Sequence, residues 1–415
     1  MTSIIKKILE TIGVRYFVAA LSLALIFVNA KVLGVSGMGL AGLIYASANI
    51  AVIFSSVLCG STIVYFMNRY DFRYVFWPAY GWAFTGSAIA CAGMIPLGML
   101  PAGFEPDVYA LAVILSLVTI HSRILLGKGH IRGFNITYLL QGGLLFFSIL
   151  FFYLIANVRD VRGYVWGLYA TNGLAWGVSL WLIFPYFVRP STDKQPVPQS
   201  VRIFLKEMFV YGLWSSADNL AENLTARLNY FLLQRLSGYS YVGLLDAGTK
   251  ISESVWHISR SVSFISLSQI AKTSDMEVQR RLTLRFIKLT FCAITFVMGV
   301  VLLIPEWVYT DYLFSAEFTG ISKVIRCLAA GIITLGCNSI FSHYFIGTGK
   351  VKYSTICSCI GLLALLLSGY FLIPAYGVSG AALSTSIAFT GMLAFSLVVF
   401  IKLTGTKLKE FFRIR

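Results

Sequence analysis

The stretch LGVSGMGL, residues 33–40, decides the fold because the chain contains a second copy of it. The copy is SGYSYVGL, residues 237–244, at a shift of 204 positions. The alignment pairs Gly34 with Gly238 and Gly39 with Gly243. One short glycine-rich turn can recur by chance, so a repeated architecture needs a second match.

That second match links later parts of the two halves. LLGKGHIR, residues 125–132, aligns with FIGTGKVK, residues 345–352, at a shift of 220 positions. In each pair, the two copies join expected spans that hold the same position in their half of the chain. These spans also cross the membrane in the same direction. We therefore predict two parallel six-helix repeats, an arrangement in which two bundles flank a central site.

The composition is that of a polytopic membrane protein. Of 415 residues, 58% are hydrophobic and 12% are charged, and the mean hydropathy is +0.79. Soluble domains carry about a quarter charged residues. Runs of about 20 apolar residues mark spanning helices. We predict twelve spans, near 12–33, 38–64, 74–98, 107–126, 134–156, 163–187, 209–234, 242–270, 287–304, 320–345, 353–373 and 377–402.

Lysine and arginine residues set the expected orientation. With the N-terminus inside, the cytoplasmic segments hold 22 of them and the outside loops hold four. Cytoplasmic loops are enriched in these residues, so we predict a multi-pass protein of the bacterial cytoplasmic (inner) membrane with both termini in the cytoplasm. The same enrichment explains the net charge of +16 without nucleic acid as a partner.

A polar, proline-containing linker divides the chain nearly in half. We expect an N-terminal six-helix bundle over residues 1–190, a cytoplasmic linker over 191–208, and a C-terminal bundle with a basic tail over 209–415. No outside loop exceeds about 15 residues on this prediction. The sequence therefore leaves no room for a catalytic domain outside the membrane.

The eighth expected span carries a stripe of ionisable residues. At 100° per residue they fall within an arc of about 80°. They are Asp246, Lys250, Glu253, His257 and Arg260. Such a stripe faces a water-filled cavity or partners in the bundle. Two explanations stay open: a polar lumen, or a ladder of ion pairs such as Asp246 with Lys250.

The seventh expected span adds a second polar face. Asp218, Glu222 and Asn229 lie within about 40° of one another, and Arg227 lies opposite Asp218. Further candidates on other spans are Arg15, Asn29, Asn49, Lys323 and Arg326. Cations outnumber anions within the spans, so a shared cavity would favour an anionic substrate over a cationic one.

Catalytic and metal-binding motifs are lacking in the sequence. GKGHIRG and GTGKVK do not have the spacing of an ATP-binding P-loop, and no His, Cys, Asp or Glu cluster has metal-ligand spacing. We expect no catalytic residues, no metal and no cofactor. His257 beside Glu253 could change protonation near neutral pH, so coupling to H⁺ or Na⁺ is an open hypothesis.

Twelve spans, a six-plus-six repeat, and two turn motifs together resemble the MOP exporter superfamily. The motifs are K-V-L-G-x-x-G-x-G (Lys31 to Gly39) and G-x-G-x-x-[KR], which ends at Arg132 in the first half and at Lys352 in the second. The chain looks most like its Wzx-type polysaccharide (O-antigen) flippases. The resemblance implies an all-α membrane protein of MOP/MATE type, with two six-helix bundles around a central cavity and alternating access.

The resemblance also implies a function and roles for residues. Members move an undecaprenyl-diphosphate-linked oligosaccharide from the inner to the outer leaflet, alongside a glycan polymerase and chain-length proteins. Arg227, Lys250 and Arg260 would accept the diphosphate, with Lys323 and Arg326 nearer the exit. Asn229 stands where relatives often carry Asp, which is a departure from the family pattern. The alternatives are a MATE-type multidrug or cation antiporter and a membrane glycan polymerase or ligase.

Overall fold

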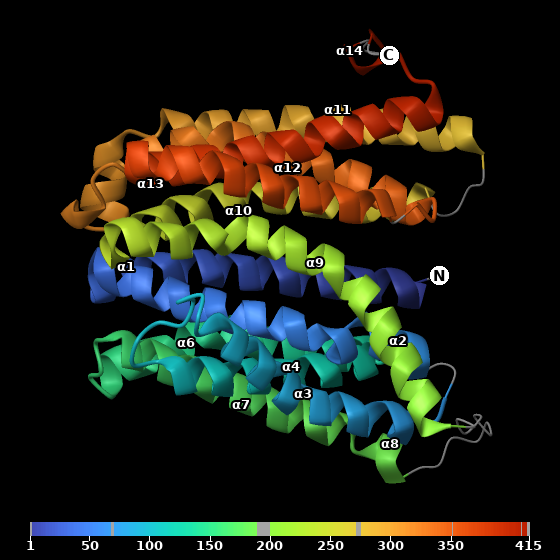
Figure 1. Ribbon diagram of the computed structural model, residues 1–415. Helices are drawn as coiled ribbons and strands as arrows, with labels where there is room; N and C mark the ends of the chain where they lie inside the picture. Colours follow the sequence, from blue (N-terminus) through green and yellow to red (C-terminus); the bar gives the residue numbers. More distant parts are fainter. Residues whose placement is uncertain are drawn as a thin grey trace. The chain divides into compact units, whose positions relative to one another are not determined.

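The computed structural model consists of helices joined by turns, with no strand among the residues that it describes (Figure 1). Contacts divide the chain into two compact units. Unit 1 comprises Met1–Leu33 and Leu40–Leu220, and unit 2 comprises Gly34–Gly39 and Ala221–Arg415. The structure describes residues 2–67, 70–188, 200–270, 275–350, 352–407 and 409–412.

Most of the first eight α-helices belong to unit 1. They are α1 (Thr2–Cys59), α2 (Ser61–Met67), α3 (Phe72–Met94), α4 (Glu105–Gly127), α5 (Ile131–Tyr138), α6 (Leu144–Leu150), α7 (Val161–Ile183) and α8 (Pro185–Val188). Two π-helical segments, η1 (Leu139–Gly143) and η2 (Phe151–Ile155), continue α5 and α6, so residues 131–155 form one helical stretch.

Unit 2 contains the remaining helices, with α9 crossing from one unit into the other. They are α9 (Val201–Ser237), α10 (Tyr239–Ile270), α11 (Met276–Leu303), α12 (Ile321–Gly347), α13 (Lys352–Thr404) and α14 (Lys409–Phe412). A π-helical segment, η3 (Val308–Leu313), and a 3₁₀ segment, η4 (Ala316–Phe318), connect α11 to α12.

The twelve expected spans all overlap described helices. Helix α13 holds two of them, and α1 holds the first and most of the second, which ends in α2. A glycine turn divides each pair, at Gly34 (φ 67°, ψ −177°) and at Gly377 (φ 56°, ψ −127°). Both conformations are largely closed to residues with a Cβ. The first of these turns belongs to the stretch that led us to expect a repeat.

The turns after α4 and α12 have the same conformation. Gly129 (φ 72°) and Gly349 (φ 73°) follow the two helix ends. In each case the glycine N–H donates to the carbonyl three residues before it, and the next N–H donates to the carbonyl five residues before it. This is the Schellman cap, which needs a left-handed residue. The turns Gly127–His130 and Gly347–Lys350, which lie in the two stretches predicted to be equivalent, therefore share one conformation.

Length and composition allow several described helices to cross a membrane. In the described part of the chain, six helical stretches meet this requirement: Gly13–Met67, Glu105–Gly127, Ile131–Ile155, Met276–Leu303, Ile321–Gly347 and Lys352–Thr404. Helices α9 and α10 are long enough but carry the charged residues noted above. The protein is a multi-pass membrane protein.

Each unit has its own apolar core. In unit 1, Ile44, Leu111, Ile149 and Leu168 are buried together from four helical stretches. In unit 2, one cluster near the start of α11 gathers Leu284, Ile287, Phe341, Phe345 and Phe400. A second cluster in unit 2 joins α10 to α11 and α12. These cores fix which face of each helix remains for polar groups.

The linker expected over 191–208 is shorter than predicted. Residues 201–208 are the first turns of α9, because Phe204 and Met208 pack into a core of unit 1. The rest of the expected linker, 191–199, lies outside the described residues. The division between units falls after Leu220, within α9.

Candidate functional site

The apolar face of α10 decides where its charged stripe points. Ile251 and Val255 are buried, and Val255 packs with Ile294 of α11 and Ile332 of α12. The stripe that begins at Asp246 is on the opposite face of the same helix. It therefore points away from the core that α10 shares with α11 and α12.

The first two groups of the stripe form an ion pair. Lys250 Nζ lies 2.7 Å from Asp246 Oδ2, one helical turn apart. Asp246 is only 2% exposed, whereas Lys250 is 30% exposed. This pair was one of those predicted from i,i+4 spacing, and the structure confirms it. Because the carboxylate is buried, its charge needs this partner.

A second ion pair joins α10 to α9. Arg227 Nη2 donates to Glu253 Oε2 at 2.8 Å, and both side chains are about one quarter exposed, at 27% and 25%. Arg227 Nη1 donates to Tyr230 Oη at 2.7 Å, and the guanidinium carbon lies 5.3 Å from the centre of that ring. Arg227 is thus held by a carboxylate and by a phenol.

Tyr230 connects the two ion pairs. Its hydroxyl donates to Asp246 Oδ1 at 3.1 Å, and its ring is buried. Arg227, Glu253, Tyr230, Asp246 and Lys250 therefore form one network, which we call the α9–α10 network. It contains two cations and two anions, so its formal charges cancel. Of the two explanations left open for the stripe, these groups fit ion pairing, with Asp246 paired along α10 and Glu253 paired across to α9.

Arg260 differs from the two cations of the network. Its side chain is exposed, and its guanidinium carbon lies 4.9 Å from the ring centre of Trp256 on the same helix. Within the described part of the chain, no carboxylate lies within ion-pair distance of it. A stacked arginine keeps its planar donor edge available for an anion. The side chain of His257, between these two residues, lies outside the described ones.

Asn229 is buried against α13. Its Nδ2 lies 2.8 Å from the Ala381 carbonyl oxygen, 3.0 Å from Ser384 Oγ and 2.8 Å from Thr385 Oγ1. Only 1% of the residue is exposed. The structure places this predicted lumen residue in a contact between helices, where an amide hydrogen bond links α9 to the second half of α13.

The structure also places the other predicted residues. Asn29 is buried in unit 1 and accepts a hydrogen bond from Tyr153 Oη at 3.1 Å, and Asn49 donates to the Tyr45 carbonyl at 2.7 Å. Arg15 is exposed, 5.9 Å above the ring of Tyr138. Lys323 and Arg326 are exposed on α12, and Glu222 is half-buried on α9. The side chain of Asp218 lies outside the described ones.

Two polar groupings were not anticipated from the sequence. Tyr230 is one, although its place three residues after Arg227 is the spacing of helix neighbours. The other is His121, buried in unit 1 between α3 and α7. Its Nε2 is hydrogen-bonded to Tyr80 Oη, and its Nδ1 lies 2.7 Å from Ser179 Oγ. Ser179 Oγ also lies 3.0 Å from the Trp176 carbonyl oxygen.

No group of three metal-ligating side chains comes together among the described residues. No known family profile matches the sequence. Over 211 residues the chain is 21% identical to the "Putative O-antigen transporter" of Shigella flexneri, and the match covers 50% of this chain and 49% of that protein. The chain thus spans about half the length of this curated relative.

Solved structures extend the comparison to nearly the whole chain. The inward-facing conformation of a multidrug resistance MATE family transporter of the MOP superfamily superimposes with a TM-score of 0.70 at 15% identity, covering 94% of both chains. The chain shares its fold with transporters of the MOP superfamily. The lipid II flippase MurJ in an inward closed conformation gives a TM-score of 0.71 at 14% identity, covering 98% of this chain and 89% of that one.

The predicted all-α fold of MOP/MATE type is confirmed by these superpositions. The predicted resemblance to Wzx-type flippases agrees with the similarity to the O-antigen transporter. All three relatives are named as transporters or flippases. The chain therefore has the fold of these membrane transporters.

Proposed function

We propose that this transporter is a flippase for an undecaprenyl-diphosphate-linked oligosaccharide, the repeat unit of an O-antigen, capsule or exopolysaccharide. It would move this cargo from the inner to the outer leaflet of the bacterial cytoplasmic membrane by alternating access. Its termini would lie in the cytoplasm, and a glycan polymerase and chain-length proteins would act on the cargo afterwards. The main support for the proposal is that Arg260 is exposed and has no carboxylate of the described residues within ion-pair distance.

Arg260 is suited to an anion because no carboxylate of the described residues neutralises it. Arg227 and Lys250 already have partners at 2.8 Å and 2.7 Å. A diphosphate could bind them only by displacing Glu253 or Asp246, which would leave a half-buried or buried carboxylate unpaired. An anion that binds Arg260 displaces no carboxylate of the described residues. A guanidinium also matches the geometry of phosphate oxygens.

Trp256 adds a second recognition element beside Arg260. Its ring supports the guanidinium at 4.9 Å, and an indole that is half-buried can also pack against an apolar sugar face. A phosphate next to a sugar is the chemistry of a lipid-diphosphate-linked glycan. An organic cation would instead be repelled by Arg260, which disfavours the MATE-type alternative.

The α9–α10 network has a positioning role in this proposal. Its charges cancel, so it contributes little net attraction for an anion. It ties α9 to α10 through Arg227 and Tyr230, and so sets the rotation of the helix face that carries Arg260. Coupling to H⁺ or Na⁺ remains part of the proposal, with Glu222 and His257 as candidate groups.

The test is leaflet transfer in proteoliposomes. A polyprenyl-diphosphate-linked oligosaccharide is loaded on one side, and its exposure to a glycosidase is followed on the other side, with and without H⁺ and Na⁺ gradients. Arg260→Ala should slow transfer about 10- to 100-fold, the value of hydrogen bonds to a charged group. Arg260→Lys should restore part of the rate because it keeps the charge.

Arg162→Ala is the matched control, because Arg162 is exposed at the start of α7 and has no place in the proposed site. It should transfer at the wild-type rate. Transfer that is unchanged in Arg260→Ala would contradict the site. If the vesicles transport an organic cation against a gradient but do not transfer the lipid-linked glycan, the proposed cargo is wrong and the antiporter is favoured. Glycan chains that lengthen in the vesicles would favour the polymerase.

A further inference from the structure

We propose that the end of unit 2 where α11 begins and α13 ends carries a binding surface for anionic phospholipid headgroups. The surface consists of the first turns of α11 and of residues 402–407, 409 and 410. It is independent of the cargo, and no residue of it belongs to the candidate site above. A partly buried arginine, Arg280, holds this segment in place.

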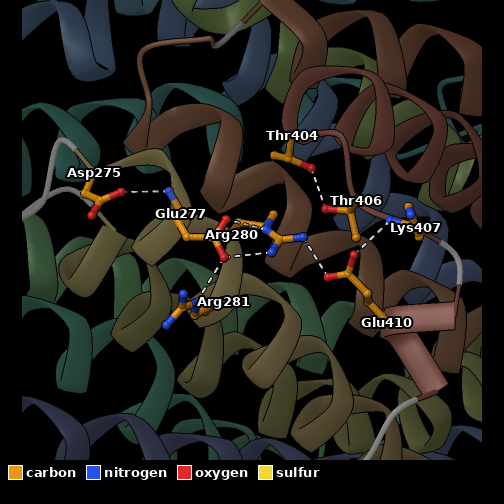
Figure 2. A network of polar contacts seen from close by, with 8 residues as sticks. All are labelled: Asp275, Glu277, Arg280, Arg281, Thr404, Thr406, Lys407 and Glu410. Atoms are coloured by element: carbon orange, nitrogen blue, oxygen red, sulfur yellow. Dashed lines mark hydrogen bonds and ion pairs between the residues drawn. The ribbon is translucent and has the colours of Figure 1, made fainter.

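Arg280 is the centre of a clasp between α11 and the segment after α13 (Figure 2). Its Nε and Nη2 donate to the two oxygens of Glu277 at 2.9 Å and 2.7 Å, and its Nη1 donates to Glu410 Oε2 at 2.6 Å. The arginine side chain is only 18% exposed. Three charge-assisted hydrogen bonds make this a well-defined attachment.

The segment between α13 and α14 is shaped to reach the clasp. Gly405 has a φ of 66°, which turns the chain after Thr404. The hydroxyls of Thr404 and Thr406 lie 2.6 Å apart, and Glu410 Oε1 accepts from the Lys407 N–H at 3.2 Å. Figure 2 shows Glu410 between Arg280 of α11 and Lys407. The segment therefore folds back onto α11.

The clasp lies next to an apolar core that forms where α11 begins and α13 ends. Leu284 and Ile287, one and two turns after Arg280, are buried with Phe400, near the end of α13. Residues just beyond the apolar part of a span lie at headgroup depth. The predicted orientation puts this end in the cytoplasmic leaflet, where anionic lipids attract basic juxtamembrane segments.

Cations exceed anions on this surface. Arg280 and Arg281 bind Glu277, and Arg280 also binds Glu410, so both carboxylates are already neutralised. Arg281 nevertheless remains 74% exposed. The other exposed cations of the two segments are Arg285, Lys402, Lys407 and Lys409. This excess, held at headgroup depth, matches the phosphates of an anionic lipid layer.

The sequence of the tail fits a membrane rather than a soluble acidic partner. The stretch KLKEFFR, residues 407–413, places Leu408, Phe411 and Phe412 among three basic residues and Glu410. Basic residues interleaved with bulky apolar ones are typical of segments that lie in the membrane interface. A purely polar partner would leave these apolar residues without a role.

The experiment measures binding of phosphatidylglycerol and phosphatidylcholine to the full-length protein by native mass spectrometry, as a titration of each lipid. The wild type should bind phosphatidylglycerol more tightly. Lys407→Gln/Lys409→Gln should weaken that binding at least about fivefold, the contribution of one basic residue near an anionic surface. Lys31→Gln/Arg162→Gln, which removes two exposed cations elsewhere, should leave it unchanged. Equal affinity for the two lipids, or equal losses in both double variants, would overturn the proposal.

Glu410→Gln tests the clasp separately. In nanodiscs of phosphatidylcholine, trypsin should cut after Lys407 and Lys409 faster in this variant than in the wild type, because Arg280 no longer has a charged partner there. Added phosphatidylglycerol should restore protection, since the lysines are intact. Cleavage at the wild-type rate would show that Arg280 does not position the tail. Faster cleavage that phosphatidylglycerol does not slow would overturn the lipid surface.

Discussion

At the scale of single residues, the central finding is which carboxylate each cation binds. Spacing within one helix predicted Asp246 with Lys250, because i,i+4 neighbours face each other. It could not predict Arg227 with Glu253, which are 26 residues apart on different helices. Two ion pairs joined by Tyr230 explain how these charges are tolerated within the membrane, because each charge has an opposite charge beside it.

Arg227→Gln should lower the thermal stability of the protein in detergent by the equivalent of about 1–3 kcal/mol, because Glu253 loses its partner while partly buried. Glu253→Gln should cost a similar amount. The double variant should be more stable than the sum of the two losses predicts, as expected for residues in direct contact. Strictly additive losses, measured as unfolding midpoints, would argue against a direct ion pair.

At the scale of helices, glycines set the closest approaches. Gly243 of α10 and Val35 in the turn 34–39 both belong to unit 2. A Cβ added at Gly243 would lie 1.8 Å from the Val35 carbonyl oxygen, and one added at Gly39 would lie 2.0 Å from the Tyr239 carbonyl oxygen. Val35 and Tyr239 correspond in the repeat, as do Gly39 and Gly243. The two copies of the opening stretch therefore contact each other through equivalent backbone positions.

Gly243→Ala should destabilise the protein by about 1–3 kcal/mol, since the methyl group meets backbone that cannot rotate away. Gly299→Ala in α11 is the matched control, because nothing lies within 4 Å of its added Cβ. That change should be neutral or stabilising by up to about 1 kcal/mol, because alanine favours the helix. Equal unfolding midpoints for the two variants would contradict the close contact.

At the scale of the whole molecule, sequence identity is low while the fold is retained. A TM-score of 0.70 accompanies 15% identity. Membrane helices tolerate extensive exchange among apolar residues, provided that length, hydropathy and small residues at contacts are kept. The distribution of lysine and arginine then sets which ends face the cytoplasm, and this remains a prediction.

Cysteine accessibility tests that orientation in intact cells. In a variant without the seven native cysteines, Arg162→Cys should react with a membrane-impermeant thiol reagent added outside. Lys128→Cys, in the turn after α4, should react only after the membrane is opened. The reverse pattern would place the termini outside, contrary to the excess of basic residues in the expected cytoplasmic segments.

The sequence by itself determined the spans, the repeat and the polar faces of α9 and α10. These depend on local properties: hydropathy, the left-handed conformation that glycine allows, and periodicity along one helix. Tertiary structure alone decided that Arg227 binds Glu253, that Asn229 is buried against residues more than 150 positions away, and that Arg260 stays exposed. A helical pattern gives the face on which a side chain lies. The group that this side chain contacts depends on the rotation and depth of the neighbouring helix. Packing between elements distant in sequence sets both.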